Sequence, residues 1–285
     1  MLGCATELPG GHAKIQRMIE RRTVFDRDGI TVADVACRHR SGRGHAVEPS
    51  PGHMIVFVRR GCFIRSADGI ETLLDPSVAY CVNPGEEHRY DHPHADGDDC
   101  TAVALDAATM AGLWGEDHPL PGEALPTPAH VDLGHRMLLA AVRRRADSHT
   151  LHEQAIAVTA GALQQRDPRR IAAGRPATDH ARRAIVNESR EALAADPGIS
   201  LSELAQRLAI SPHHLSRVFR SHTGHTLARH RMLLRARAGL ELIADGERDL
   251  ARLAADLGFA DQSHLCRVIK PLTGQTPAAL RAALG

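Results

Sequence analysis

One helical pattern occurs twice in the last hundred residues, at an interval of about 50 residues. The copies span residues 201–220 and 250–270, and each is followed by a Thr-Gly pair. Each copy predicts a short helix, a tight turn and a second helix, because apolar residues recur at helical spacing on both sides of a break. The C-terminal part of the chain is therefore expected to fold as two similar helix-turn-helix units.

The sequence also predicts how each second helix begins and which side of it is buried. Ser211 is placed to cap the first, with Pro212 at the first helical position, where a missing N–H costs nothing, and Asp261 is placed to cap the second. Ala205 and Ala254 stand where two helices must approach closely. The expected buried stripes are Leu215, Val218 and Phe219 in the first copy and Leu265, Val268 and Ile269 in the second.

The opposite, polar side of each second helix carries side chains that can read base edges. In a helix-turn-helix protein this helix enters the major groove, where Arg can bond guanine and Gln can bond adenine. The candidates are His213, Ser216 and Arg217 in the first copy and Gln262, Ser263, Cys266 and Arg267 in the second. Arg220 and Lys270 lie one turn further on and suit phosphates better. A solvated helix face is the alternative, which the duplication of cap, turn and stripe disfavours.

A long helix is expected between the two copies, from about Thr226 to Asp245, with Arg229, Arg231 and Arg235 exposed. A helix of about 18 residues spans roughly 27 Å. Bent DNA brings successive major grooves closer together than the roughly 34 Å of straight DNA. A stiff helix of this length can therefore place two recognition helices in adjacent grooves.

These motifs resemble the DNA-binding domain of the AraC/XylS family of bacterial transcription regulators. The resemblance covers about residues 180–283 and includes segments 211–219, 223–226, 238–243, 254–267 and 273–277. It implies sequence-specific binding of double-stranded DNA by two units of one chain, usually to activate transcription, with RNA polymerase as a partner. The chain departs from the family pattern at Ile269, where Phe is usual, and at Leu280, where Tyr is common. It also has Pro271, which is expected to end the second recognition helix early.

The N-terminal part of the chain reads as strands. Examples are residues 30–36, 53–58, 62–65, 78–82 and 100–105, separated by turns that contain Gly or Pro. Short strands at this spacing suggest an antiparallel sandwich or barrel. From Val131 the period becomes helical, and helices at about 131–142 and 151–165 are expected to form an αα-hairpin. Such a hairpin is a candidate homodimer surface; the alternative is that it only covers the barrel.

The expected fold is α+β in three parts. Residues 1–166 form an antiparallel β-barrel with the αα-hairpin, residues 167–178 form a linker rich in Pro, Gly and Arg, and residues 179–285 form an all-α domain with two helix-turn-helix units. Residues 178–285 hold 15 Lys and Arg against 11 Asp and Glu, a mildly basic balance that suits nucleic acid but does not prove it. Without a long apolar run or a secretory signal, we expect a cytoplasmic protein with no membrane contact.

Residues 83–90, Asn-Pro-Gly-Glu-Glu-His-Arg-Tyr, resemble half of a cupin signature and imply a cupin-like sensor domain. Barrels of this kind usually hold a small molecule, so we expect an effector pocket. The expected lining is His45, Phe57, Phe63, Tyr80 and His88, although these side chains could equally just fill the barrel. The other half of the signature, His-x-His followed by Glu, is absent, and His39, His45 and Glu48 have the wrong spacing.

A further set of side chains in this region has the chemistry of metal ligands. His88, His92, His94 and Cys100, with Cys62 and Cys81 on neighbouring strands, are donors that zinc accepts. The chain has 19 histidines, however, so a cluster by chance is common, and we assign no metal ligand and no cofactor. The six cysteines lack CxxC spacing and are expected to be free thiols.

The preferred interpretation is a transcription regulator, not an enzyme, that responds to a small-molecule effector. One alternative is a metal-dependent cupin enzyme with an accessory helical domain, which predicts bound metal and turnover of a substrate. The other is an adaptor whose helical repeats bind protein, which predicts no salt-dependent affinity for duplex DNA.

Overall fold

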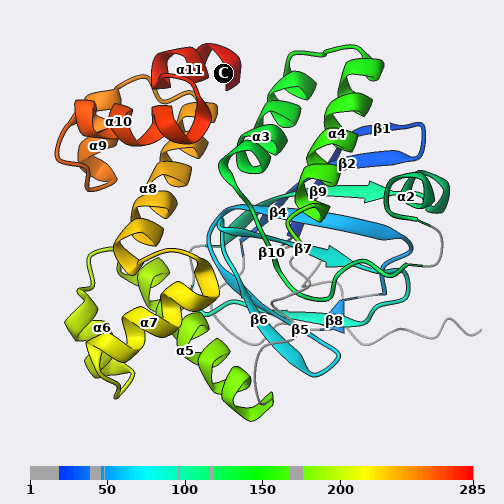
Figure 1. Ribbon diagram of the computed structural model, residues 1–285. Coiled ribbons are helices and arrows are strands. Elements are labelled where there is room, and N and C mark those ends of the chain that lie inside the picture. Colours follow the sequence, from blue (N-terminus) through cyan, green and yellow to red (C-terminus); the bar gives the residue numbers. More distant parts are fainter. Residues whose placement is uncertain are drawn as a thin grey trace, which may run out of the picture.

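The computed structural model describes residues 19–38, 46–47, 49–94, 97–115, 118–166 and 176–284. Strands come first and helices follow, which confirms the predicted α+β class. Figure 1 shows the strands on one side of the molecule and the C-terminal helices on the other. Two helices, α3 (Ala129–Arg143) and α4 (Ser148–Leu163), lie over the strands.

The described strands pair in antiparallel fashion and form two sheets, with the orders β1-β2-β9-β4-β7-β10 and β3-β8-β5-β6. No strand of one sheet pairs with a strand of the other among the described residues, so the sheets form a sandwich and the expected barrel is not closed. The chain changes sheet after β6, at a turn where Ser77 donates two hydrogen bonds to Asp75. The bounds are β1 (Ile19–Arg27), β2 (Ile30–Cys37), β3 (Ala46–Val47), β4 (His53–Arg60), β5 (Phe63–Ala67), β6 (Ile70–Leu74), β7 (Val78–Val82), β8 (His88–Asp91), β9 (Asp98–Leu105) and β10 (Leu125–Pro126).

Alternation along β4 sends its side chains into two different cores. Ile55 and Phe57 face a core that includes residues of α3 and α4, whereas Val56 and Val58 face the space between the sheets. The central strands of the six-stranded sheet are therefore buried on both faces, whereas its edge strand β1 is mostly exposed. This explains why β4, β7 and β9 read as nearly continuous apolar runs rather than as alternating ones.

The helices α3 and α4 form the predicted hairpin on the outer face of the six-stranded sheet. Asp147 caps α4 by accepting from the Thr150 N–H at 2.9 Å. A shorter helix, α2 (Ala107–Trp114), follows β9. Met137 and Ala140 of α3 also join the core of the C-terminal helices, so α3 lies between the two halves of the chain.

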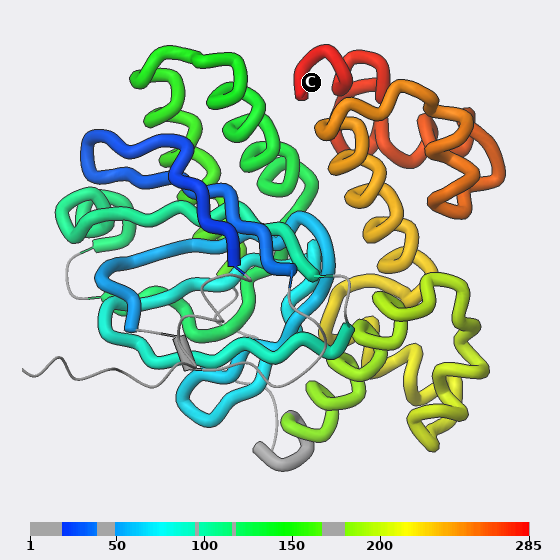
Figure 2. Tube along the Cα trace, turned by 180° about the vertical axis from the view of Figure 1, so that it is seen from behind, coloured from blue at the N-terminus to red at the C-terminus, as the bar shows by residue number. Residues whose placement is uncertain are grey.

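In the C-terminal part, α8 (Leu227–Ala244) runs between two groups of helices, as Figures 1 and 2 show from opposite sides. We call α5 (Pro176–Ala195), α6 (Leu201–Arg207) and α7 (Pro212–Thr223) the first unit, and α9 (Leu250–Asp256), α10 (Gln262–Thr273) and α11 (Pro277–Leu284) the second unit. Residues 167–175 of the expected linker lie outside the described residues, and residues 176–178 are already helical because α5 begins at a proline, a favoured first residue. None of the described helices is both long and apolar enough to cross a membrane.

We call the two sheets and the helices α2, α3 and α4 together the β domain. A buried carboxylate of the β domain binds an arginine of the first unit. The Asp75 carboxylate lies 2.8 Å from both Nε and Nη2 of Arg190, and His230 of α8 lies 3.9 Å away. All three residues are at most 7% exposed. Burial alone would raise the pKa of Asp75, but the charge and hydrogen bonds of Arg190, together with His230 and the Ser77 hydroxyl, outweigh it and hold that pKa well below its usual range.

A second set of buried charges joins α3 and β4 to α8. Arg136, 1% exposed, pairs with Glu241 and donates to Asp132 at 3.4 Å. Arg237 Nε lies 3.7 Å from the same Asp132, and Arg59 of β4 lies 3.4 Å from Glu241. We call these five residues the α8 ion network. Because its members come from three elements, it fixes the orientation of α8 against the β domain.

The turn inside each unit passes through the left-handed backbone region. Ala209 has φ 53° and Gly258, at the corresponding position, has φ 71°. Glycine adopts this conformation freely, whereas for alanine it costs about 1–2 kcal/mol. The first turn is therefore locally strained and the second is not.

We expect Gly258→Ala to lower the free energy of unfolding by about 1–2 kcal/mol. Alanine would be strained there, and its Cβ would lie 3.2 Å from the guanidinium carbon of Arg235. The reverse change, Ala209→Gly, should alter stability by less than about 1 kcal/mol, because relief of strain offsets the added freedom of the unfolded chain. Urea unfolding measures both variants, and equal destabilisation by the two would contradict the backbone assignment.

Acid should weaken the fold through His230. Burial, assisted by Arg190 and Arg237 and opposed by Asp75, lowers the pKa of His230 to about 4 from an ordinary 6.5. As the pH falls, the unfolded chain therefore takes up a proton at His230 before the folded chain does. The stability that neutral His230 contributes is fully present above pH 6.5 and is lost as the pH falls toward 4. Between pH 7 and pH 5 the free energy of unfolding should fall by about 2 kcal/mol through this group.

The variant His230→Gln should therefore show a shallower fall in unfolding free energy over this pH range than the wild type. The exposed His149 provides a matched control, since His149→Gln should keep the wild-type slope. A His230→Gln variant with the wild-type slope would show that His230 is not buried in its neutral form.

Candidate nucleic-acid interface

The second helix of each unit, α7 or α10, begins and ends in the same way. Ser211 and Asp261 each accept a hydrogen bond from the backbone N–H three residues later, at 3.1 and 2.6 Å, so both predicted N-caps are confirmed. At the other end Gly224 and Gly274 have φ 75° and 74°, the left-handed conformation that ends many helices. The repeat in the sequence is thus a repeat in three dimensions.

The buried side of each helix is the predicted apolar stripe. Leu215, Val218, Phe219, Leu265 and Ile269 are between 0 and 4% exposed, and Val268 is half-buried. Ala205 and Ala254, in the preceding helices, are equally buried, as close packing of two helices requires. The two units therefore share one packing scheme, which determines the side of α7 and α10 that faces water.

The side chains predicted to contact DNA lie on that outer side. His213, Arg217, Arg220, Gln262, Ser263, Arg267 and Lys270 are exposed, and Ser216 and Cys266 are half-buried. We call these nine residues the reading surface. Its four cations take part in none of the ion pairs formed by the described residues, so their charge is available to an anionic partner.

Pro271 does not end α10 early, contrary to the prediction. The helix continues to Thr273, and the Gly274 N–H donates to the Lys270 carbonyl at 2.8 Å. Proline lacks an N–H, but in the last, exposed turn only one helical hydrogen bond is lost. Ile269 and Leu280, the other departures from the family pattern, are fully buried in the core of the second unit.

The central helix α8 is tied to both units. Arg235 donates to the Gly258 carbonyl in the second unit at 2.9 Å and to the Pro197 carbonyl in the first unit at 3.2 Å. Arg231 donates to the Ile199 carbonyl, also in the first unit. Both side chains are half-buried, so the prediction of exposure holds only for Arg229. The spacing of the units is therefore fixed by side chains as well as by the helix.

Inside the β sandwich, aromatic rings occupy the expected effector pocket. Phe63, Tyr80 and His88 are buried there, and the half-buried Tyr90 packs against them. The rings of Phe63, Tyr80 and Tyr90 lie 5.4–6.1 Å apart, and the two tyrosine hydroxyls are 2.8 Å apart. Burial, followed by the charge of Arg65, lowers the pKa of His88 to about 4. These side chains pack against one another between the sheets.

Phe57 does not share that space with the other expected lining residues. Side chains alternate along β4, so Phe57 faces α3 and stacks on His135 with ring centroids 5.0 Å apart. His45 lies outside the described residues, as do His39 and Glu48. The expected lining is thus divided between the two faces of one sheet.

The suggested His and Cys ligand set is also dispersed. Cys81 lies on the helix-facing side of the sheet and Cys100 on the side that faces between the sheets. Among the described residues, three ligand atoms converge only at Cys37, His92 and Asp98, within 4.8 Å of one another. His92 is one of the ligands suggested by the sequence, whereas Cys37 and Asp98 are not. These two residues meet only because β2 and β9 pair in a register that the sequence does not reveal. No ligand atom in this group comes from His88, His94 or Cys62.

A cavity of about 520 Å³ lies between the β domain, α3 and α8. Its lining includes the arginines Arg22, Arg38, Arg59, Arg60, Arg136 and Arg143 and the acids Asp34, Asp99, Glu241 and Asp245. The volume suits a small molecule, and the excess of arginine favours an anionic one. This cavity could not be predicted from the sequence because its walls come from segments far apart in the chain.

Comparison with known proteins bears on the C-terminal part. The family model described as "Helix-turn-helix domain" matches residues 204–283. The chain is 29% identical over 161 residues to the HTH-type transcriptional regulator GlxA of Rhizobium meliloti, a match that covers 55% of this chain and 48% of the relative. It is 31% identical over 88 residues to the arabinose operon regulatory protein of Escherichia coli, covering 31% of this chain and 30% of the relative. The chain thus matches less than half of the length of either relative.

Among solved structures, ToxT from Vibrio cholerae is similar with a TM-score of 0.34 at 11% identity, covering 90% of this chain and 99% of that chain. KdgF from Halomonas sp. is similar with a TM-score of 0.28 at 18% identity, covering 33% of this chain and 85% of that chain. The family match and the duplicated geometry carry the identification. Residues 204–283 of this chain therefore match the helix-turn-helix domain family, and the C-terminal region is similar in sequence to the arabinose operon regulatory protein.

Proposed function

We propose that this chain is a sequence-specific DNA-binding transcription regulator. The observation that carries the proposal is the reading surface on two matching helices at the ends of one fixed helix. The 18 residues of α8 correspond to about 27 Å, less than the roughly 34 Å between major grooves on straight DNA. We therefore expect both units to bind one face of a bent duplex.

Five of the nine residues of the reading surface receive a role from their chemistry and their place on the helix. Arg217 and Arg267 occupy corresponding exposed positions, where a guanidinium can bond guanine through two hydrogen bonds. The amide of Gln262 can bond adenine in the same way. Arg220 and Lys270 lie one turn later and are assigned to phosphates, which orient the helices without reading sequence.

We expect Arg217→Ala and Arg267→Ala each to weaken binding to the specific site by about 1–3 kcal/mol and to relax the base preference at one position. Fluorescence anisotropy on the preferred duplex and on a scrambled duplex, at one fixed salt concentration, measures both effects. The control is Arg27→Ala, which removes an exposed arginine of β1, carries the same charge change and should leave affinity near that of the wild type.

Equal losses on the specific and the scrambled duplex would show that these arginines contact only phosphates. Wild-type affinity for duplex DNA that does not fall with salt would overturn the proposal itself, because phosphate contacts release counterions.

We further propose that a small anionic molecule regulates DNA binding from the cavity beside α8. That cavity is lined by β strands, by α3 and by Glu241 and Ala244 of α8. A ligand there would touch both halves of the chain, and it would act by binding one arrangement of α8 more tightly than another. We place the effector here and not inside the sandwich because the rings of Phe63, Tyr80 and Tyr90 pack against one another there.

Self-association and contact with RNA polymerase belong to the same proposal. Since α3 is buried between the sheet and the second unit, self-association through the hairpin would use the outer side of α4. Glu153, Ala157 and Gln164 are exposed on that helix and its end. Activation of transcription would follow from a polymerase contact made by a chain that is already bound to DNA.

A further inference from the structure

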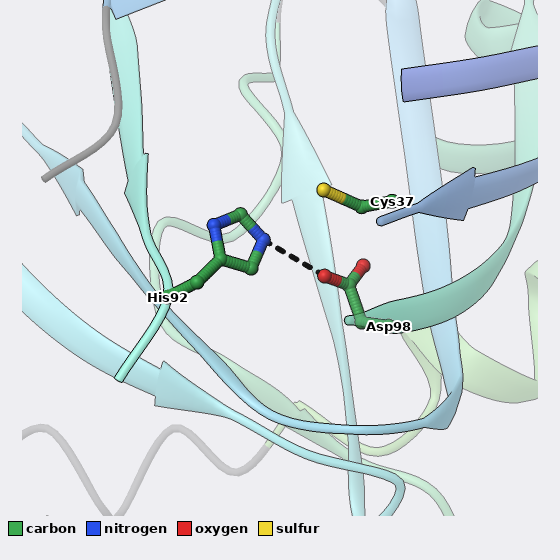
Figure 3. Close-up of side chains that lie close together, drawn as sticks. All are labelled: Cys37, His92 and Asp98. Atoms are coloured by element: carbon green, nitrogen blue, oxygen red, sulfur yellow. Dashed lines mark hydrogen bonds and ion pairs between the residues drawn. The ribbon is translucent and has the colours of Figure 1, made fainter. Parts of the chain in front are cut away.

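We propose that Cys37, His92 and Asp98 form a binding site for a borderline divalent transition-metal ion, with Zn²⁺ as the best match. A thiolate sulfur, an imidazole nitrogen and a carboxylate oxygen are the three donor types that zinc takes from proteins. The three ligand atoms lie within 4.8 Å of one another and all three residues are buried. Figure 3 shows the side chains directed toward one another from different segments.

The site joins the two sheets at one end of the sandwich. Cys37 is the last residue of β2 and Asp98 the first of β9, and they are direct cross-strand partners. His92 follows β8, which belongs to the other sheet, and its Nε2 lies 2.8 Å from Asp98 Oδ2. Ligand atoms around tetrahedral zinc are about 3.3–3.8 Å apart, so an ion needs this pair to open by less than about 1 Å.

The backbone beneath the donors is held rigidly. A Cβ on Gly97 would lie 2.2 Å from the Cys37 carbonyl oxygen, and one on Gly61 would lie 2.2 Å from the Gly97 carbonyl oxygen, so only glycine allows these segments to meet. The Arg38 guanidinium donates to the carbonyls of Cys37 and Asp98 at 3.2 and 3.3 Å. Two of the three donors are therefore in place before an ion binds, which lowers the cost of ordering them.

Apart from its ion pair with His92, which is itself a proposed ligand, the Asp98 carboxylate is not taken up by the nearby charges. Arg38 and Arg60 pair with the adjacent Asp99, at 2.7 and 2.9 Å, and not with Asp98. A second thiol, that of Cys100, lies on the same face of β9 and donates to Asp98 Oδ1 at 3.6 Å. It orients the carboxylate as an outer-shell partner would, and it is a candidate for the fourth position of a closed tetrahedral site.

The geometry favours a closed structural ion over a catalytic one. Cys37, at 4% exposure, and the equally buried His92 and Asp98 leave no opening for a substrate. A closed ion that links β2, β9 and the end of β8 would add its binding energy to the stability of the sandwich. The inference concerns the β domain alone, so it stands or falls independently of DNA binding.

The test uses the purified full-length chain, stripped with a chelator, and Zn²⁺ alone as the probe. Competition with a chromogenic chelator should show one ion per chain. Cys37→Ser and Asp98→Asn should each weaken binding by at least the roughly 100-fold that loss of an outer-shell partner can cause. Two matched controls should bind like the wild type: Cys81→Ser removes a buried thiol from the other face of the sheet, and His149→Gln removes an exposed histidine.

Two further readouts keep the test decisive if one variant folds poorly. Zn²⁺ should raise the Tm of the wild type and of Cys81→Ser, but not that of Asp98→Asn, which keeps the shape of the side chain. With Co²⁺ in place of Zn²⁺, a sulfur-to-metal charge-transfer absorption should appear in the wild type and be absent from Cys37→Ser. Wild-type affinity no greater than that of Cys37→Ser, or no charge-transfer absorption in the wild type, would overturn the proposal.

Discussion

Buried charge between the β domain and the helices around α8 is the constraint on which the arrangement of this chain depends. Asp75 and Asp132 lie at the contact between the two halves, and each meets an arginine of the C-terminal part. A buried ion pair adds little net stability, but removing one partner leaves an uncompensated charge at a cost of about 3–5 kcal/mol. Arg190 of α5 satisfies Asp75 and Arg237 of α8 satisfies Asp132, so a placement of the two helices that satisfies both carboxylates leaves them little freedom to slide or rotate.

That orientation links the reading surface to the rest of the molecule. The first unit is held through Arg190, whereas the second is held by apolar packing on α3 and by Arg144, which donates to carbonyls at the end of α11. Arg235 connects the two units directly. The outer sides of α7 and α10 remain open to a partner. A ligand in the cavity beside α8 would contact Arg59, Arg136 and Glu241 of the α8 ion network, which fixes the orientation of α8.

The sequence was informative wherever structure is local and less so where it depends on register. The caps at Ser211 and Asp261 and the stripes of α7 and α10 follow from spacing alone, so the units could be predicted in detail. Strand β1 lies within the part of the chain that reads as strands, although its residues are mostly exposed and polar. The effect of Pro271 was predicted wrongly because it depends on the place of this proline in the last turn of α10. The side of the sheet that Phe57 faces, the meeting of Cys37 with Asp98 and the α8 ion network all arise from long-range pairing, which periodicity does not report.

The central claim is that a rod of fixed length presents two groove-reading helices to one face of a duplex. Its most direct test is affinity for a selected site into which base pairs are inserted between the two half-elements. An insertion of about 5 base pairs, half a turn, should reduce affinity to that of a single half-element, and about 10 base pairs should not restore it, because α8 cannot lengthen. Full affinity at every spacing, or recovery at a whole turn, would show that the two units move independently and would contradict the account.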